Sequence, residues 1–313
     1  MSDNLAPAGP AVGVRVAAVD CGTNSIRLLI ADLVGGQLVE VDRRMTIVRL
    51  GQGVDATGAF APEALERVFE AAEDFASVIR STGVSRIRFV ATSAARDVSN
   101  RDAFSAGIEA RLGVRPEIIS GGEEAELSFR GATTSLDLPA PYLVADIGGG
   151  STELVLGDAT GVIAAESLDI GSVRLTERHV TTDPTSGPEL QAIAKDIDAL
   201  LDATTVPLED ARAFIGVAGT CTTVAAVALN LAEYDRTAVH HARLTTAQLR
   251  SATTWLTTST RAERSAVRSI HPGRIDVIGA GALILQRLYD RLPVTDLTVS
   301  EHDILDGVAL SLR

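Results

Sequence analysis

The chain has 313 residues, 46% of them hydrophobic, and its formal net charge is -13 at pH 7. That length suits two domains with substantial cores better than one. The negative charge excludes non-specific nucleic-acid binding, and the scarcity of aromatic residues (4%) argues against a base-stacking platform. No stretch resembles a signal peptide or a membrane span, and Cys21 and Cys221 read as reduced thiols. We therefore expect a cytoplasmic protein with no membrane partner.

In the first half of the chain, predicted strands and helices alternate. Residues 1–12 are expected to be disordered. The elements that follow are, in chain order, strands over 14–20, 26–33 and 37–48, a helix over 62–82, a strand over 86–91, a helix over 101–112, a strand over 115–119 and a helix from about 123. This alternation is typical of layered α/β units, and we assign it to a first domain, residues 13–136.

A Pro-rich segment over 137–141 is the expected linker to a second domain, residues 137–300. The predicted elements there are strands over 142–146, 153–157 and 162–168, helices over 172–180 and 187–202, a strand over 212–217, helices over 222–231, 246–256, 260–268 and 273–289, and a strand over 296–299. We expect the last segment, 301–313, to form a helix that returns to the first domain.

Two segments are built on one plan of strand, Asp, small-residue turn and returning strand. They are Asp20-Cys-Gly-Thr-Asn-Ser25 and Asp146-Ile-Gly-Gly-Gly-Ser-Thr-Glu153. Glycine allows a tight turn whose backbone N–H groups approach a ligand closely, so such turns can bind phosphate. A structural hairpin turn is the alternative, particularly for the first segment. We predict a shared phosphate cleft lined by Gly22, Thr23, Asn24, Ser25, Gly148, Gly149, Gly150 and Ser151.

Acidic residues beside these turns are candidates for holding a cation. An Asp at a strand end can bind a metal ion that neutralises phosphate oxygens, which applies to Asp20 and Asp146. Asp146 and Glu153 flank the second turn, and both could reach one cation. Mg²⁺ is the expected ion, since it accompanies phosphate-rich substrates and needs only one or two carboxylates from the protein.

Three further positions carry alternative interpretations. Glu123 and Glu124 lie in the first turn of a predicted helix, where acidic residues usually interact with the helix dipole. The functional interpretation is that one of them faces the cleft and activates water. Arg96 follows a strand end and either binds a phosphate oxygen or is a surface residue. A third Gly/Thr turn, over 216–223, joins a strand to a helix and is either an anion site or ordinary capping.

Together, these motifs resemble the Ppx/GppA family of exopolyphosphatases and guanosine pentaphosphate phosphohydrolases, and most closely its short actinobacterial members. The resemblance spans residues 14–313. It rests on the two Asp-turn segments and on Ala91-Thr-Ser-x-x-Arg96, Ile119-Ser-Gly-x-Glu-Glu-Ala125, Gly171-Ser-Val-Arg-Leu175 and His271-Pro-Gly-Arg274-x-Asp276.

The resemblance implies an α/β fold of two actin-like, RNase H-like domains with a cleft between them. It implies Mg²⁺-dependent hydrolysis of the terminal phosphoanhydride of inorganic polyphosphate, of pppGpp, or of both. Carried over by position, Glu124 is the catalytic base, Asp146 and Glu153 belong to the magnesium site, and Arg96 binds phosphate. A homodimer is also expected. The C-terminal extension of the longer members is absent from this sequence.

Two hypotheses from other classes stay open on the sequence alone. An actin-like nucleotide sensor would bind and close without turnover. A small-molecule kinase on the same fold would need an acceptor pocket and contacts to the ADP ribose, and the Glu123–Glu124 pair argues against it.

Overall fold

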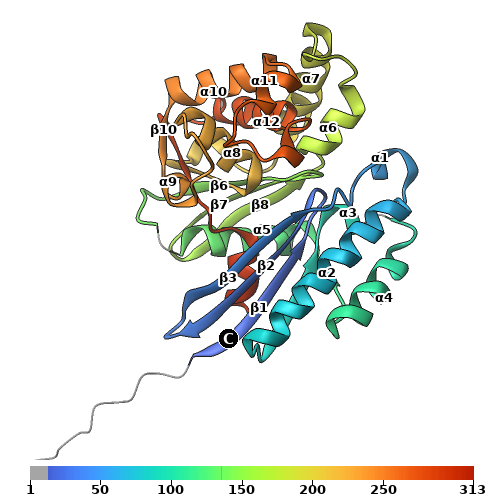
Figure 1. Ribbon diagram of the computed structural model, residues 1–313. Coiled ribbons are helices and arrows are strands. Elements are labelled where there is room, and N and C mark those ends of the chain that lie inside the picture. Colours follow the sequence, from blue (N-terminus) through green and yellow to red (C-terminus); the bar gives the residue numbers. More distant parts are fainter. Residues whose placement is uncertain (1–12, 97, 135) are drawn as a thin grey trace, which may run out of the picture.

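The computed structural model describes residues 13–96, 98–134 and 136–313, so the expected disorder of residues 1–12 lies outside the described residues. Two mixed β-sheets stand one above the other, with helices on their faces (Figure 1). Within the described ranges, no helix is both long and apolar enough to cross a membrane.

The first sheet has the strand order β3-β2-β1-β4-β5. β1, β2 and β3 form an antiparallel meander, while β4 pairs in parallel with β1, and β5 with β4. Side chains of β1 alternate between two cores: Ala17 and Val19 face one cluster, and Val16 and Ala18 the other. The strands are β1 (Val14–Cys21), β2 (Ser25–Val34), β3 (Gln37–Ile47), β4 (Arg86–Ala91) and β5 (Glu117–Ile118).

The second sheet repeats this plan. β6, β7 and β8 form an antiparallel meander, β9 pairs in parallel with β6, and β11 with β9. A short strand, β10, adds an antiparallel edge beside β11. The strands are β6 (Tyr142–Ile147), β7 (Thr152–Asp158), β8 (Gly161–Leu168), β9 (Ala213–Val217), β10 (Arg243–Thr245) and β11 (Asp296–Val299). The shared topology confirms the predicted α/β fold with two actin-like sheets.

Helices cover the faces of both sheets. Those of the first half are α1 (Val54–Thr57), α2 (Pro62–Thr82), α3 (Ser93–Arg96), α4 (Arg101–Leu112) and α5 (Gly121–Thr133). Those of the second half are α6 (Ser172–His179), α7 (Gly187–Ala203), α8 (Ala218–Ala228), α9 (Arg236–Val239), α10 (Thr246–Thr258), α11 (Arg261–Ser265), α12 (Ile278–Tyr289) and α13 (Ile304–Leu310), with 3-10 turns η1 (Leu208–Asp210) and η2 (Pro272–Arg274).

Helices α5 and α13 cross between the two sheets, and their backbones are in direct contact. α5 packs on the second sheet through Phe129 and Ala125, whereas α13 packs on the first sheet through Leu305 and neighbouring apolar residues. A side chain at Gly131 would overlap the backbone carbonyl of Asp303, so only glycine fits there. The C-terminal helix therefore returns to the first sheet, as predicted. The exact domain boundaries stay a prediction.

Most element predictions agree with the structure, and two are wrong. The predicted helix over 222–231 begins at Ala218 and ends at Ala228. The predicted helix over 273–289 is two elements, because Pro272–Arg274 form a 3-10 turn capped by the His271 ring, which accepts from the Gly273 N–H. The regular helix begins only at Ile278. This break matters for the site, because it presents Arg274 to the cleft.

Candidate active site

The two predicted Asp-turn segments adopt the same turn. The Gly22 N–H donates to the Ser25 carbonyl at 2.9 Å, and the Gly148 N–H donates to the Ser151 carbonyl at 3.0 Å. Each turn follows a buried strand that carries an Asp two residues before the glycine. The repeated sheet topology brings the turns to the same cleft.

One cavity of about 90 Å³ lies between the turns. It brings together most of the predicted site residues: Asp20, Gly22, Thr23, Asn24, Ser25, Glu124, Asp146, Gly148, Gly149, Gly150 and Ser151. Two predicted residues, Arg96 and Glu153, do not line it. Arg96 lies behind Glu124, to which it donates, and Glu153 lies opposite Asp146 on the neighbouring strand.

Unpaired backbone donors are available around this cavity. In the part of the chain that the structure describes, the backbone N–H groups of Thr23, Asn24, Gly149 and Gly150 make no hydrogen bond within the protein. The Gly148 N–H, in contrast, donates to the Ser151 carbonyl within its own turn, and phosphate binding by Gly148 stays a prediction. Four free N–H groups on two facing turns suit the oxygens of an anion.

The second turn requires glycine for a packing reason as well. A Cβ at Gly150 would lie 2.5 Å from the Thr23 hydroxyl and 2.6 Å from the Ser93 hydroxyl. At Gly149 it would lie 3.0 Å from the Cβ of Thr23. The two turns therefore touch across the cleft, and any larger residue would hold them apart.

Glu124 reaches the cavity from the first turn of α5, which is capped by the Ser120 hydroxyl. Its side chain is buried, and the Arg96 guanidinium donates to its Oε2 at 2.6 Å. Burial raises the pKa of Glu124 to about 7, helped by the nearby charges of Asp146 and Asp20, while Arg96 opposes the shift. A carboxyl group with that pKa is suited to take a proton at neutral pH.

Asp146 and Glu153 form a buried acidic pair across β6 and β7, where they are directly opposite each other. Burial and the charge of Asp303 raise the pKa of Asp146 to about 6, although the Ser128 hydroxyl donates to its Oδ2 at 2.6 Å. Burial and the charge of Glu124 raise the pKa of Glu153 as well. The Ser167 hydroxyl donates to Glu153 at 2.7 Å, and Glu153 does not line the cavity.

Asp20 has a different partner at the equivalent place. Arg27 lies opposite it across β1 and β2 and donates to its Oδ2 at 2.6 and 3.0 Å. Arg27 also pairs with Asp303, the N-cap of α13. The other oxygen of Asp20, Oδ1, is buried without a hydrogen-bond partner. An orphaned carboxylate oxygen beside raised-pKa acids is a place where a cation would be stabilised.

The described residues contain no group of three or more His, Cys, Asp or Glu side chains arranged to hold a metal ion by themselves. Mg²⁺ does not need such a cage, because it retains waters and shares its coordination with substrate phosphates. The orphaned Oδ1 of Asp20 and the carboxylate of Asp146 therefore fit a substrate-bound Mg²⁺. The position of Glu153 fits a supporting role behind them.

Two arginines that the sequence reasoning did not assign to the site line the cavity: Arg27 and Arg274. Arg274 packs directly on Gly219, and among the described residues its guanidinium has no ion pair or hydrogen bond. The strand register could have predicted Arg27. Arg27 lies opposite Asp20 in the first sheet, just as Glu153 lies opposite Asp146 in the second. Arg274 was quoted only as part of a motif, and its role depends on the break before α12.

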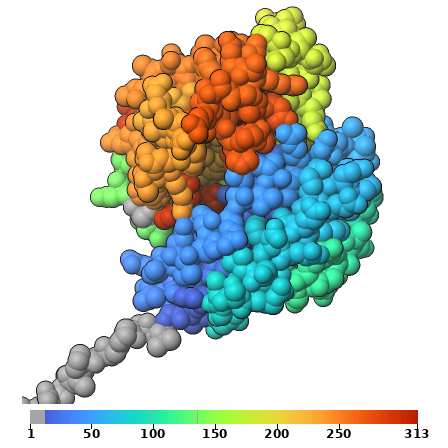
Figure 2. Space-filling model, in the orientation of Figure 1, coloured from blue at the N-terminus to red at the C-terminus, as the bar shows by residue number. Residues whose placement is uncertain are grey.

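A second cavity, of about 380 Å³, adjoins the first and shares Arg27, Ala218, Gly219 and Arg274 with it. We call it the arginine cavity, because Arg27, Arg43, Arg44, Arg268 and Arg274 all line it, against the acids Glu301 and Asp303. It opens in the hollow between the β3 region and the 230–275 region (Figure 2). An extended anion reaching the small cavity would find its counter-charges here.

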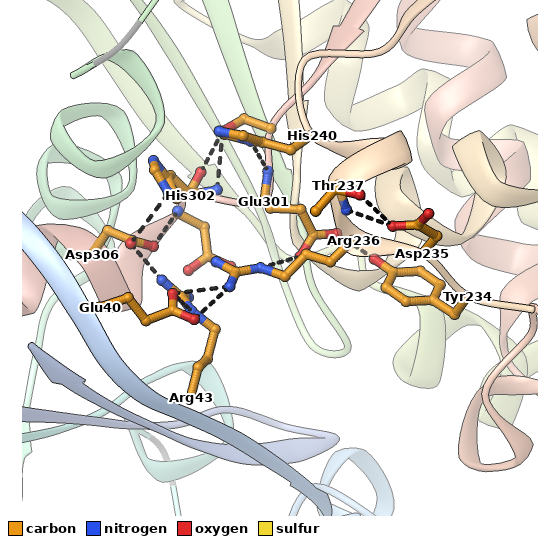
Figure 3. A network of polar contacts seen from close by, with 12 residues as sticks. Glu40, Arg43, Tyr234, Asp235, Arg236, Thr237, His240, Glu301, His302 and Asp306 are labelled. Atoms are coloured by element: carbon orange, nitrogen blue, oxygen red, sulfur yellow. Dashed lines mark hydrogen bonds and ion pairs between the residues drawn. The ribbon is translucent and has the colours of Figure 1, made fainter.

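A polar network bridges the two halves of the molecule beside this cavity (Figure 3). Arg236 of α9 donates to Glu40 of β3 at 2.7 Å and lies 3.3 Å from Glu301. Arg43 of β3 donates to Asp306 of α13 at 2.5 Å. These ion pairs hold β3 against the C-terminal segment and so fix one wall of the arginine cavity.

The site is that of a phosphate-cleaving enzyme on an actin-like fold, and comparison with known proteins identifies the family. Residues 29–313 match the Ppx/GppA phosphatase family. The chain belongs to that family.

Individual relatives cover nearly all of the chain. Exopolyphosphatase 2 of Mycobacterium tuberculosis is 50% identical over 95% of this chain and 98% of its own length. The crystal structure of an exopolyphosphatase-like protein is 46% identical, with a TM-score of 0.92 over 96% of this chain and 98% of that one. A guanosine-5'-triphosphate,3'-diphosphate pyrophosphatase of Vibrio atlanticus is 28% identical over 95% of this chain but only 59% of its own length.

Proposed function

We propose that this protein is an exopolyphosphatase, which hydrolyses the terminal phosphoanhydride bond of inorganic polyphosphate and releases orthophosphate. The observation that carries the proposal is a buried Glu124 facing a small cavity with four unpaired backbone N–H groups. The Mycobacterium tuberculosis relative, with 50% identity over nearly the whole chain, supports the same activity.

Glu124 is the proposed general base. A water molecule attacks the terminal phosphorus, and its proton passes to the Glu124 carboxylate as the bond to the bridging oxygen breaks. That oxygen leaves as the new terminal oxygen of the shortened chain. Arg96 holds Glu124 through Oε2, which leaves Oε1 for the water. Arg96 thus acts as a positioning residue, in place of the direct phosphate contact that the sequence suggested.

The two turns bind the terminal phosphoryl group. The free N–H groups of Thr23, Asn24, Gly149 and Gly150 donate to its oxygens, which carry most of the charge in the transition state. Asp146 and Asp20 would hold Mg²⁺, with Glu153 behind Asp146. When bound, Mg²⁺ neutralises phosphate charge that would otherwise repel both the attacking water and the surrounding acids.

The arginine cavity receives the rest of the polyanion. Glu301 and Asp303 attract the Arg274 guanidinium without forming an ion pair or hydrogen bond with it, so it can bind phosphate without breaking an existing pair. An overall charge of -13 repels polyphosphate, and the local cluster of arginines offsets that repulsion where the chain binds.

Hydrolysis of pppGpp is the alternative activity. The relative with that printed activity is 28% identical, and this chain spans 59% of it, so polyphosphate is the first substrate to test. The non-catalytic sensor and the kinase lose support, because Glu124 is held in a position to activate water and no relative reported above is a kinase. Homodimerisation and a cytoplasmic location stay predictions.

The test is orthophosphate release by the purified protein with Mg²⁺, comparing long polyphosphate, tripolyphosphate, pppGpp and ATP at matched concentrations of terminal phosphate. We expect the highest kcat/KM on polyphosphate. Release from pppGpp alone would move the protein to the alternative activity. Tight binding of polyphosphate with no release would favour the sensor.

A further inference from the structure

A third cavity lies on the side of the active site away from the arginine cavity. It has a volume of about 250 Å³ and is formed by α1, α3, α6 and the two phosphate turns. We call it the far cavity. Figure 1 shows α1 beside α6 on one side of the cleft and α9 near β3 on the other. The arginine cavity, the active-site cavity and the far cavity therefore follow one another along the cleft.

The wall between the active-site cavity and the far cavity is thin. Thr23, Ser93 and Gly150 line both cavities, and their atoms meet at this point. The two side chains are small hydroxyls, which change rotamer readily and can hydrogen-bond a passing anion. The three residues that line both spaces carry no bulky side chain.

Ion pairs between α1 and α6 cross the cleft at the far cavity, which Asp55 and Arg174 both line. Asp55 of α1 pairs with Arg174 and with Arg178, both of α6, the latter at 2.9 Å. Arg174 also donates from Nε to the Gly150 carbonyl at 2.8 Å, which connects these ion pairs to the phosphate turn. Helix α1 is bounded by Gly53 and Gly58, with φ of 71° and 65°.

The proposed reaction constrains the order in which its two products can leave the protein. Orthophosphate forms at the inner end of the bound chain, while the shortened polyphosphate still occupies the arginine cavity. Orthophosphate can leave by that side only after the whole chain has left. A second opening allows it to leave while the chain stays and advances.

We propose that the far cavity is the exit for orthophosphate, and that the ion pairs of Asp55 with Arg174 and Arg178 are its gate. This inference rests on the proposed function. Orthophosphate passes the hydroxyls of Thr23 and Ser93 into the far cavity. There it competes with Asp55 for Arg174, so one anion replaces another on that guanidinium and the displaced Asp55 carboxylate is released to solvent.

The experiment narrows the exit without touching the active site or the gate. Val54 lines the far cavity from α1, and its side chain is apolar. Val54→Trp narrows the cavity, and Val54→Phe narrows it less. The matched control is Val39→Trp, at a position on β3 that is 53% exposed and distant from this cavity. Thermal unfolding of all three variants checks that they fold.

Two rates are compared on long polyphosphate. Single-turnover cleavage, with enzyme in excess and acid quench, measures chemistry alone and is expected within about twofold of wild type. Steady-state turnover, which also includes product release, is expected to fall about tenfold in Val54→Trp, less in Val54→Phe, and not in Val39→Trp. Chains of intermediate length should accumulate, because each chain must now leave before orthophosphate does. Steady-state turnover of tripolyphosphate should fall less, because its short product leaves the arginine cavity and opens that side to orthophosphate.

Unchanged steady-state turnover and chain-length distribution in a folded Val54→Trp would overturn the proposal that the far cavity is the exit. Equal loss in single-turnover cleavage would also overturn it, since the substitution would then act on chemistry. Failure of the proposed function would appear differently, as absence of orthophosphate release from polyphosphate by the wild-type protein.

Discussion

Glu124 is the residue on which the chemistry depends. If it removes the proton from water, kcat/KM must rise with pH as this carboxyl group ionises, and its pKa of about 7 places that rise between about pH 6 and 8. A pH-rate profile on polyphosphate at constant Mg²⁺ measures it. A profile that is flat from pH 5.5 to 8 would contradict this role.

The same raised pKa predicts how stability depends on pH. Between about pH 4.5 and 7 the native state retains a proton on Glu124 that the unfolded chain has lost, so the free energy of unfolding falls as pH rises, by at most about 1.4 kcal/mol per unit from this group. Glu124→Gln has no ionisable group at this position, so its free energy of unfolding does not fall with pH for this reason. It should therefore be more stable than wild type at pH 8 and similar at pH 4.5, measured by urea unfolding without Mg²⁺. Equal stability at both values would show that the carboxyl group ionises normally.

Arg274 offers a test of substrate binding that leaves the fold intact. Nearby Glu301 and Asp303 attract its guanidinium without forming an ion pair or hydrogen bond with it, so Arg274→Gln breaks neither kind of contact. We expect a rise in KM for polyphosphate of about tenfold, with a small change in melting temperature. Arg287→Gln, which removes a surface pair with Asp198, is the control and should leave KM unchanged. An unchanged KM in Arg274→Gln would remove this residue from the binding site.

Mg²⁺ binding can be detected without turnover. Mg²⁺ should raise the melting temperature at pH 8, because it relieves repulsion among the buried acids around Asp146 and binds only the folded state. Asp146→Asn should lose most of that shift, with NaCl of equal ionic strength as the control. A full shift retained in Asp146→Asn would place the ion elsewhere.

At the scale of elements, the crossing of α5 and α13 holds the site together. α5 carries Glu124, and Asp303 at the start of α13 holds Arg27. Gly131→Ala would push the two backbones apart, and we expect it to cost about 1–3 kcal/mol in the free energy of unfolding. Gly122→Ala on the same helix meets only the Ser120 hydroxyl, at 3.9 Å, and should be neutral or slightly stabilising. Equal effects of the two substitutions, measured by denaturant unfolding, would contradict the close crossing.

Elements with strong local signals were predictable from sequence. The helix Pro62–Thr82 has Pro at its start and Gly83 after its end, and both boundaries agree with the structure. The break before α12 was not predictable, because a ring–backbone contact of His271 and the position of Arg274 in the cleft decide it. Short elements such as β10 depend on a neighbouring strand and carry no periodic signal of their own.

At the scale of the whole molecule, the duplicated turns could be predicted because both are written locally as Asp followed by small residues. The residues that surround these turns in the folded protein could not be predicted. The pairing of Glu124 with Arg96 and of Asp303 with Arg27 joins residues that are distant in the sequence. Those contacts depend on how α5 and α13 pack in the folded protein, which no local pattern encodes.

The measurement that tests the account most directly is cleavage of polyphosphate by Glu124→Gln under single-turnover conditions, alongside direct measurement of polyphosphate binding. The account predicts a cleavage rate lower by about 10²–10⁴-fold, with binding affinity within a few-fold of wild type, because the substitution removes the base and leaves both phosphate turns. Cleavage at the wild-type rate would contradict it, and Glu123 would then be the next residue to test.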